Sequence, residues 1–276
     1  LLEKEVQKRT EKIAQQADEL RALDDVKSRF FANISHELRT PLTLITGPVN
    51  AILERYYGTD WQKVDAVLEV VKRNGNQLEK LIEEILLLSK LERDNIVPEF
   101  KSVLFFPFIQ RLFKAFEVEA ELKNITYQLD YQLDKELFLL LDENKLEKII
   151  NNLLSNAFKY TSTGKIELIV QTVSSSKEAI VFDLVVMDSG QGISEKDLPY
   201  IFDRYYQSKE KAASIEGGVG IGLALAAEFA EVLGGNLSVE STFGQGSVFK
   251  LQLKAAHLQA VNVAEWIVPE VELEAI

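Results

Sequence analysis

The chain is organised around one segment, Phe30-Phe31-Ala32-Asn33-Ile34-Ser35-His36-Glu37-Leu38-Arg39-Thr40-Pro41, which contains one of the protein's two histidines. Apolar residues around it recur at alternating intervals of three and four, the spacing of an amphipathic helix. We therefore expect His36 to project from a helical rod, where its neutral imidazole can act as a nucleophile. Glu37 can orient the ring or accept its proton, and Thr40 shares the face of His36 because it lies four residues on. Pro41 lacks an N–H group, so the rod should bend here.

The heptad spacing extends over residues 6–53, and polar residues at some seam positions predict a weak coiled coil over residues 1–26. It could relay a signal by changing register or rotating, or it could be a plain dimer stalk, and the sequence does not separate the two. Gly58 ends the first helix, and Asp60 is a good N-cap for a second helix whose apolar stripe reaches Leu91. Two such helices joined by a short loop form an antiparallel hairpin, and each stripe is wider than one neighbour can cover. Hairpins from two chains would complete a four-helix bundle, which predicts a homodimer.

The hydrophobic period changes at Pro98, where we place the boundary between a helical domain, residues 27–97, and a mixed domain, residues 98–256. In the second domain, short β-branched and aromatic runs predict strands at residues 125–133, 165–172, 179–187, 237–241 and 247–253. Periodic runs predict helices at residues 108–120, 143–160 and 221–233. The order predicts an α/β domain that is not a regular βαβ array. Residues 257–276 read as a tail or linker, in which His257 has no supporting motif.

Composition excludes several classes of function. A formal charge of −12 argues against a nucleic-acid surface, and the absence of cysteine excludes a disulfide framework or a thiolate metal site. No apolar run reaches the roughly 18 residues that span a bilayer, and no signal peptide is visible. Because the chain begins with Leu1, we expect a piece of a longer protein in which any membrane anchor lies upstream.

Two segments of the mixed domain carry side chains suited to a nucleotide. Asn152 and Asn156 lie four apart in a predicted helix, and Lys159 continues their face, so two amides and an ammonium could hold Mg²⁺ and a polyphosphate. An ordinary helix end is a poor alternative, because the helical pattern continues beyond them. Asp188 follows an apolar strand and could accept the exocyclic amine of adenine. The motif Asp-x-Gly-x-Gly from residue 188 to residue 192 lets the backbone come close to the ring, although alone it also marks ordinary turns.

Two further segments complete this set. A charged stretch follows Tyr205-Tyr206 and continues to residue 215, and its few apolar residues predict a mobile lid. The run Gly217-Gly218-Val219-Gly220-Ile221-Gly222-Leu223 opens a predicted helix, whose amides and dipole favour phosphate. Because neither Gly-x-Gly-x-x-Gly nor the P-loop pattern occurs, Rossmann and P-loop folds are disfavoured.

Taken together, these motifs resemble the sensor histidine kinases of two-component systems, in the family's order from residue 27 to residue 253. The segment ending at Pro41 resembles their phosphoacceptor box. The later motifs, with Phe243-Gly244-Gln245-Gly246-Ser247, resemble their catalytic ATP-binding domain, which is shared with gyrase and Hsp90. The resemblance implies a helical hairpin forming a dimeric four-helix bundle with an N-terminal coiled coil. An α/β two-layer sandwich of the histidine kinase and Hsp90-like ATPase type would follow.

The resemblance also implies an activity, in which ATP phosphorylates His36 and the phosphoryl group passes to an aspartate of a response-regulator receiver domain. Glu37-x-x-Thr40 resembles the family's phosphatase motif. The resemblance implies Mg²⁺ ligation by Asn156, phosphate contact by Lys159, adenine stacking near Tyr160 and adenine recognition by Asp188. Other nucleotide-binding residues implied in this way are Asn152, Gly190, Gly192, Tyr205, Lys209, Gly218, Gly220, Gly222, Leu223 and Ser247. The chain would be the cytoplasmic region of an inner-membrane sensor, and the tail could lead to a receiver domain, as in hybrid kinases.

One departure keeps two alternatives open. Gln207 stands where the family often has a phosphate-contacting arginine, for which Arg204, Lys209 or Lys211 could substitute. A gyrase-type ATPase would carry a general-base glutamate where this chain has Asn152, and an amide cannot activate water. A dimeric, nucleotide-responsive scaffold is the second alternative: the intact segment around His36 argues against it, and the missing arginine argues slightly for it.

Overall fold

The structure is a computed structural model that describes residues 2–58, 60–93, 97–176, 178–204, 206 and 220–256. The chain divides into two compact units, one built mainly from the first two helices and one from an α/β sheet, and each is described by itself. No helix of the described residues combines the length and apolar character needed to cross a membrane.

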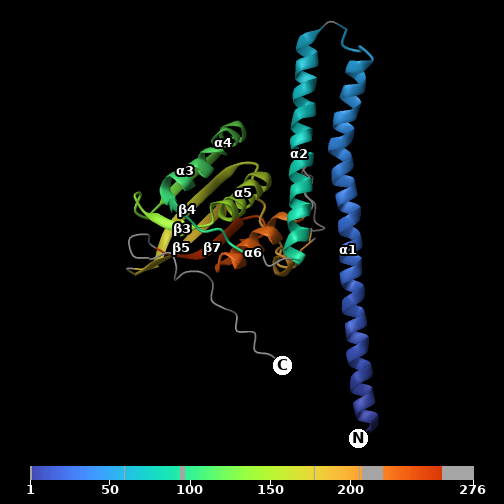
Figure 1. Ribbon diagram of the computed structural model, residues 1–276, viewed down its shortest axis with the longest axis vertical. Coiled ribbons are helices and arrows are strands. Elements are labelled where there is room, and N and C mark those ends of the chain that lie inside the picture. The colour runs from blue at the N-terminus through green and yellow to red at the C-terminus, as the bar shows by residue number, and fades with distance from the viewer. Residues whose placement is uncertain are drawn as a thin grey trace. The chain divides into compact units, whose positions relative to one another are not determined.

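The helical hairpin consists of α1 (Leu2–Leu53) and α2 (Trp61–Arg93), which lie side by side and antiparallel (Figure 1). The turn between them contains Arg55 and Gly58 in the left-handed region, at φ 57° and 59°. Asp60 then accepts a hydrogen bond from the backbone N–H of Lys63 at 3.3 Å, as an N-cap does. The N-cap at Asp60 is therefore confirmed. The first helix ends earlier than the predicted Gly58, at Leu53, because Arg55 already adopts the left-handed conformation.

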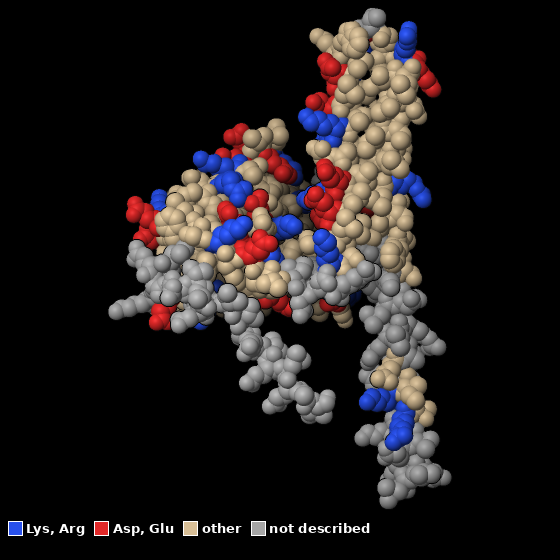
Figure 2. All heavy atoms as spheres, viewed as in Figure 1, with Lys and Arg blue, Asp and Glu red and all other residues tan. Residues whose placement is uncertain are grey.

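The hairpin buries few of its described side chains. They recur at intervals of seven, Ile34 and Pro41 on α1 and Asn74 and Leu81 on α2, which is the heptad period expected from the sequence. The amide of Asn74 donates to the carbonyl of Val70 at 2.8 Å, so its donor is satisfied within the helix. Figure 2 shows broad uncharged areas on the visible face of the hairpin.

The backbone of α1 is unusual around His36, because the helix runs through Pro41 and Pro48, which cannot donate to the carbonyls four residues earlier. Four hydroxyls nearby donate to carbonyl groups at that same spacing of four. The donors are Ser35, Thr40, Thr43 and Thr46, and the acceptors are Phe31, His36, Arg39 and Leu42, at 2.8, 3.2, 2.9 and 2.9 Å. The helix remains continuous, and the bend expected at Pro41 stays a prediction.

The second unit is built on a five-stranded sheet with the order β2-β4-β5-β7-β6. Its strands are β2 (Ile125–Tyr131), β4 (Gly164–Ser175), β5 (Ala179–Asp188), β6 (Asn236–Thr242) and β7 (Gly246–Ala256). Only β2 and β4 are parallel, and the other neighbours are antiparallel. A separate antiparallel pair joins β1 (Lys101–Leu104) and β3 (Phe138–Leu141). The sheet is therefore mixed, as the order of elements predicted.

One face of the sheet is covered by helices (Figure 1). They are α3 (Phe105–Lys114), α4 (Glu117–Lys123), α5 (Glu143–Tyr160) and α6 (Gly222–Val232), and the 3₁₀ turn η1 (Leu198–Tyr200) follows β5. Alternate residues of β4 and β5 are fully buried, including Leu168 and Leu184. Helix α5 adds Leu154 to the same core, and Lys148 of α5 lies 5.8 Å from the ring of Phe229 of α6. Helix α5 therefore packs against both β5 and α6.

The N-terminus of α5 is held by a buried carboxylate. Asp142 accepts hydrogen bonds from the backbone of Lys145 at 3.0 Å and of Glu99 at 2.8 Å, and it pairs with the Lys145 ammonium at 2.5 Å. Burial alone would raise the pKa of Asp142, but these hydrogen bonds outweigh it and lower the pKa. Asp142 therefore ties the start of the α/β unit to its central helix.

Two parts of the sequence prediction need correction. The helix predicted at residues 108–120 is wrong as one element, because α3 and α4 are separated at Phe116, which has φ −106° and ψ 0°. The ring of Phe116 stacks on Phe158 of α5 at 5.4 Å, and we attribute the break to this contact. The short strands β1 and β3 were not predicted. The helix predicted at residues 143–160 and the five strands of the main sheet are confirmed.

Candidate active site

The first candidate residues lie on α1. His36 and Thr40 are exposed one turn apart, and Glu37 is half-buried. The Thr40 hydroxyl donates to the carbonyl of His36 at 3.2 Å. The imidazole is therefore open to a reactant from solvent, while the hydroxyl already has a backbone partner.

The second group lies on α5, where Asn152 and Asn156 are both half-buried. The amide nitrogen of Asn156 donates to the amide oxygen of Asn152 at 3.0 Å. This bond uses the oxygen of Asn152 and leaves the amide oxygen of Asn156 available as an acceptor. Because Mg²⁺ prefers oxygen ligands and often takes only one or two from the protein, Asn156 fits as its protein ligand beside a polyphosphate.

The end of α5 adds a cation and an aromatic ring. The Lys159 ammonium lies 5.3 Å from the centre of the Tyr160 ring, which is 41% exposed. The helix ends at Thr161, whose N–H donates to the carbonyl of Ala157 at 3.0 Å. Lys159 and Tyr160 are thus presented together at the C-terminus of the asparagine-bearing helix.

Asp188 is the last residue of β5 and is 8% exposed. Its carboxylate accepts the N–H of Gly190 at 2.8 Å, and both the N–H and the hydroxyl of Ser247, its neighbour on β7, also donate to it. Burial raises the pKa of Asp188 by more than these hydrogen bonds lower it. The Ser247 hydroxyl lies 3.0 Å from that of Ser241 on β6, so a chain of hydroxyls holds the carboxylate in place.

The glycines after Asp188 allow the loop to approach α5. A Cβ atom on Gly190 would lie 2.4 Å from the carbonyl oxygen of Tyr160, too close for any side chain. The next residue, Gln191, donates its N–H to that carbonyl at 3.2 Å. Gly192 follows at φ 68°, in the left-handed region that glycine adopts readily. The structure therefore brings Asp188, Gly190, Gly192 and Ser247 together with the end of α5.

Thr161 belongs to this group but was not singled out from the sequence. It is 1% exposed, and its hydroxyl faces the Asp188 carboxylate, whose pKa it lowers. The same Cβ on Gly190 would meet the Thr161 hydroxyl at 2.8 Å and the Asp188 carboxylate at 2.9 Å. A polar residue directly after the predicted helix was the available signal, but only the fold shows that it reaches the end of β5.

The remaining candidates belong to the lid and the glycine run. Gly220 has φ 74°, and α6 begins at Gly222, followed by Leu223. Three other candidates lie outside the described residues, namely Tyr205, Lys209 and Gly218, as do Gln207, Lys211 and His257. Arg204 is described and is half-buried.

Comparison with known proteins identifies both regions. Residues 26–94 match the family described as the His Kinase A (phospho-acceptor) domain, and residues 141–257 match the histidine kinase-, DNA gyrase B- and HSP90-like ATPase family. The sensor histidine kinase TmoS of Ectopseudomonas mendocina is 35% identical over 87% of this chain and 24% of its own length. The hybrid signal transduction histidine kinase D of Dictyostelium discoideum is 29% identical over 98% of this chain and 18% of its own length.

Among solved structures, full-length ShkA in complex with AMPPNP aligns with a TM-score of 0.59 at 24% identity, over 82% of this chain and 45% of ShkA, which shows a shared fold. The chain spans about a quarter or less of the length of the two relatives above. The two matched families follow each other in the order of the hairpin and the α/β unit. The chain therefore belongs to the histidine kinases of two-component systems and carries their transmitter region, a phosphoacceptor hairpin followed by an ATPase-type α/β domain.

Proposed function

We propose that this chain transfers the γ-phosphoryl group of ATP to His36 and passes it on to an aspartate of a response-regulator receiver domain. The observation that carries the proposal is the buried carboxylate of Asp188, held against the end of the helix that bears Asn156 and Lys159. Such a site can grip an adenine at one end and a polyphosphate at the other. The exposed imidazole of His36, inside a matched phosphoacceptor domain, supplies the acceptor.

At the adenine end of the site, the ionised carboxylate of Asp188 accepts a hydrogen bond from the exocyclic amine of the adenine. Gly190 and Gly192 let the loop backbone lie close to the ring, and Tyr160 offers an exposed aromatic surface for stacking. Because of the raised pKa of Asp188, the affinity for ATP should depend on pH. As pH falls through that pKa, the carboxylate gains a proton and the affinity for ATP decreases.

At the phosphates, Lys159 contacts an oxygen, and the free amide oxygen of Asn156 would hold Mg²⁺, which supplies charge neutralisation for the transferred group. The lone pair of a His36 ring nitrogen attacks the γ-phosphorus. A nitrogen–phosphorus bond forms, the bond to the bridging oxygen breaks, and ADP leaves with the electron pair. Glu37 accepts the proton that the cationic ring then gives up.

Hydrolysis of the gyrase type is disfavoured at Asn152. A hydrolase needs a base at this position, but the amide cannot take a proton, and its oxygen already accepts from Asn156 at 3.0 Å. A nucleotide-responsive scaffold would bind ATP without using His36, so labelling of His36 separates it from the kinase.

The proposal includes a dimer formed through the hairpin and a longer parent protein. We infer that the chain is the cytoplasmic region of a sensor whose membrane anchor lies upstream, and that Glu37-x-x-Thr40 supports dephosphorylation of the regulator. The relatives named above are a sensor kinase and a hybrid kinase, each much longer than this chain, which supports a longer parent protein.

The test is phosphoryl transfer from γ-³²P-ATP in the wild type and the variants His36→Gln and Asn156→Asp. We expect acid-labile label in the wild type, none in His36→Gln with ATP binding unchanged, and greatly reduced label in Asn156→Asp. Equilibrium binding of a fluorescent ATP analogue provides the matched control for folding. Label that persists in His36→Gln would remove His36 as the acceptor, and release of inorganic phosphate without label would favour the hydrolase.

A further inference from the structure

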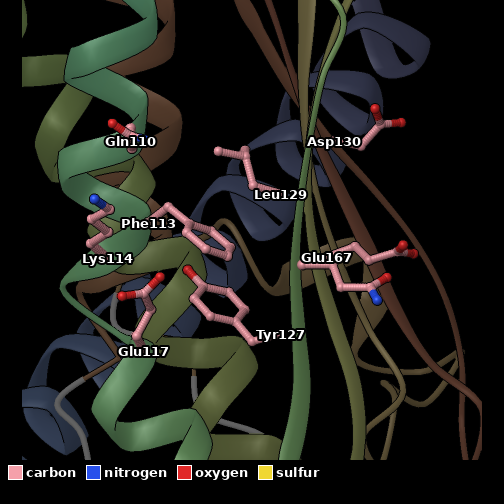
Figure 3. A pocket seen from close by; sticks show the side chains of 9 residues that line it. Gln110, Phe113, Lys114, Glu117, Tyr127, Leu129, Asp130 and Glu167 are labelled. Carbon is pink, nitrogen blue, oxygen red and sulfur yellow. The ribbon is translucent and has the colours of Figure 1, made fainter.

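A second surface lies apart from the residues assigned to ATP. We call it the edge groove, a hollow of roughly 500 Å³ between α3, α4 and the outer strand β2 (Figure 3). The helices contribute Gln110, Phe113, Lys114 and Glu117, and the sheet contributes Tyr127, Gln128, Leu129, Asp130 and Glu167.

The groove runs along a free strand edge. Within the described residues, strand β2 is the outermost strand of the sheet and pairs only with β4. Gln132 donates its N–H to the carbonyl of Val170 on β4 at 2.9 Å. Because the main-chain groups of successive residues in a parallel strand point alternately to opposite sides, those of Leu129 and Tyr131 point to the free edge. An extended segment could pair with them.

Helix α3 forms the other wall and runs antiparallel to β2. The ring of Phe106 lies 4.9 Å from that of Tyr131, and the ring of Phe113 stacks on Tyr127 at 4.0 Å. The helix therefore follows the strand for several residues. A wall of this length suits an extended peptide better than a compact ligand.

The floor of the groove is apolar with one unused donor. Phe113, Tyr127 and Leu129 supply the apolar surface, as Figure 3 shows. The Tyr127 hydroxyl is buried and has no hydrogen-bond partner within the described part of the chain. A buried donor without a partner is costly, so the free protein carries an unsatisfied polar group beneath this surface.

The rim is negatively charged. Glu117 and Lys114 lie on the helix side of β2, while Asp130 and Glu167 point to its other side, as Figure 3 shows. Among the residues that line the groove, three carboxylates therefore stand against the single ammonium of Lys114. Glu167 also pairs with Lys165 at 2.5 Å, which leaves Glu117 and Asp130 as the carboxylates that most need a cation. A basic occupant is therefore favoured.

We propose that the edge groove binds an extended, basic peptide segment of a partner protein, which adds as a strand to the free edge of β2. Charge argues against two nearer candidates. Residues 257–276 of this chain contain four glutamates and neither lysine nor arginine, and a second copy of the chain carries a net charge of −12. Main-chain pairing would supply affinity. An apolar side chain facing Phe113 and neighbouring basic side chains facing Asp130 on the other side would supply specificity.

The experiment is a titration of the ¹⁵N-labelled 276-residue chain with short blocked peptides, followed by backbone amide shifts. The probes are a peptide alternating valine with arginine, one alternating valine with glutamate, and the arginine peptide N-methylated on alternate amides. We expect saturable shifts at Leu129 and Tyr131 with the arginine peptide alone, weakening at high salt. Equal binding of the N-methylated peptide would overturn strand addition, and equal binding of the glutamate peptide would overturn the charge argument.

Substitutions that remove single carboxylates from the edge groove test whether the peptide binds there. Glu117→Gln and Asp130→Asn should each weaken the arginine peptide by roughly three- to tenfold, because each deletes one rim charge. Glu240→Gln is the matched control, since Glu240 is exposed on β6, the opposite edge strand, and should change nothing. If Glu240→Gln weakens binding as much as the rim variants do, the edge groove is not the site.

Two alternative occupants are tested in the same way. The chain truncated after Ala256 should show unchanged β2 amide shifts, and dilution of the full chain should also leave them unchanged. A change on truncation would make residues 257–276 the occupant, and a change on dilution would make it a second copy. Either result would overturn the proposal.

Discussion

The two units of this chain differ in how much of their own apolar surface they bury. In the α/β unit, both layers contribute fully buried side chains, such as Phe105, Leu154 and Phe182. In the described part of the hairpin, only Ile34, Pro41, Asn74 and Leu81 are buried, while Phe31, Leu42 and Leu86 are 56%, 51% and 58% exposed. The uncharged areas of the hairpin in Figure 2 agree with this difference.

The two units therefore depend on different sources of stability. A helix pair with apolar residues on its outer faces is completed only by further helices, and a second copy provides them most simply. The α/β unit has a core of its own and needs no partner. Variants in each unit should therefore respond differently to protein concentration.

The largest effect should come from the α/β core. Leu154→Ala removes a side chain with no exposed surface and should lower the free energy of unfolding by about 3 kcal/mol. The loss would be measured by denaturant unfolding followed by far-UV circular dichroism, which reports on the backbone. Val118→Ala, on the 66% exposed Val118 of α4, is the control and should cost far less. Equal losses would mean that the core does not stabilise the unit as described.

The next effect should appear in the hairpin and depend on concentration. Leu42→Glu combined with Ile82→Glu places charges on apolar positions that are 51% and 46% exposed in a single hairpin. We expect dimerisation to weaken by roughly 30-fold, about 2 kcal/mol, because the charges would be buried between copies. Sedimentation equilibrium measures the dissociation constant, and Gln77→Glu at an exposed polar position is the control. An unchanged dissociation constant would place the dimer contact elsewhere.

A smaller effect, independent of concentration, should follow removal of the α5 cap. Asp142→Ala should cost about 1 to 2 kcal/mol, because it deletes the N-cap and the bond to Glu99. The folded pKa of Asp142 is lowered, so its contribution is present above the unfolded pKa and is lost as pH falls through the folded pKa. Urea unfolding from pH 7 into the acid range should show a flatter pH dependence in the variant than in the wild type. Parallel curves would contradict this role.

The smallest structural effect should be that of Thr40→Ala, which removes an exposed hydroxyl whose partner is a helix carbonyl. We expect a change of less than about 0.5 kcal/mol, because alanine is the best helix former. Autophosphorylation should be largely retained, while dephosphorylation of a phospho-regulator should slow if the hydroxyl orients water. The decay is measured with ADP and a non-hydrolysable ATP analogue, to exclude back-transfer. Equal decay rates in variant and wild type would remove Thr40 from the mechanism.

Much of this fold could be predicted because local signals agree with the tertiary structure. Gly58 and Asp60 mark the hairpin turn, although Arg55 ends the first helix sooner, and α5 has a clear N-cap and helical period. The break at Phe116 could not be predicted, since the contact to which we attribute it is with a ring far away in the sequence, at residue 158. Strands β1 and β3, of four residues each, are too short for a period to show.

The residues of the candidate site that stand in sequence motifs could be predicted, and those that only the fold brings there could not. Asp188, Gly190 and Ser247 stand in recognisable motifs, and the structure brings these three together. Thr161 was missed, because nothing near it in sequence indicates that the end of α5 reaches the end of β5. The edge groove was missed for a similar reason, since α3 and β2 become neighbours only through the fold.

The hydroxyl and proline pattern of α1 has a mechanical consequence. The backbone carbonyls of Glu37 and Leu44 lack a helical N–H donor, because proline stands four residues later in each case. In the same turns, threonine hydroxyls also donate to the carbonyls of His36, Arg39 and Leu42. A rod with weakened axial bonds over one short length has its lowest bending stiffness there. We therefore expect a torque or tilt applied at either end of the rod to bend it most easily next to His36.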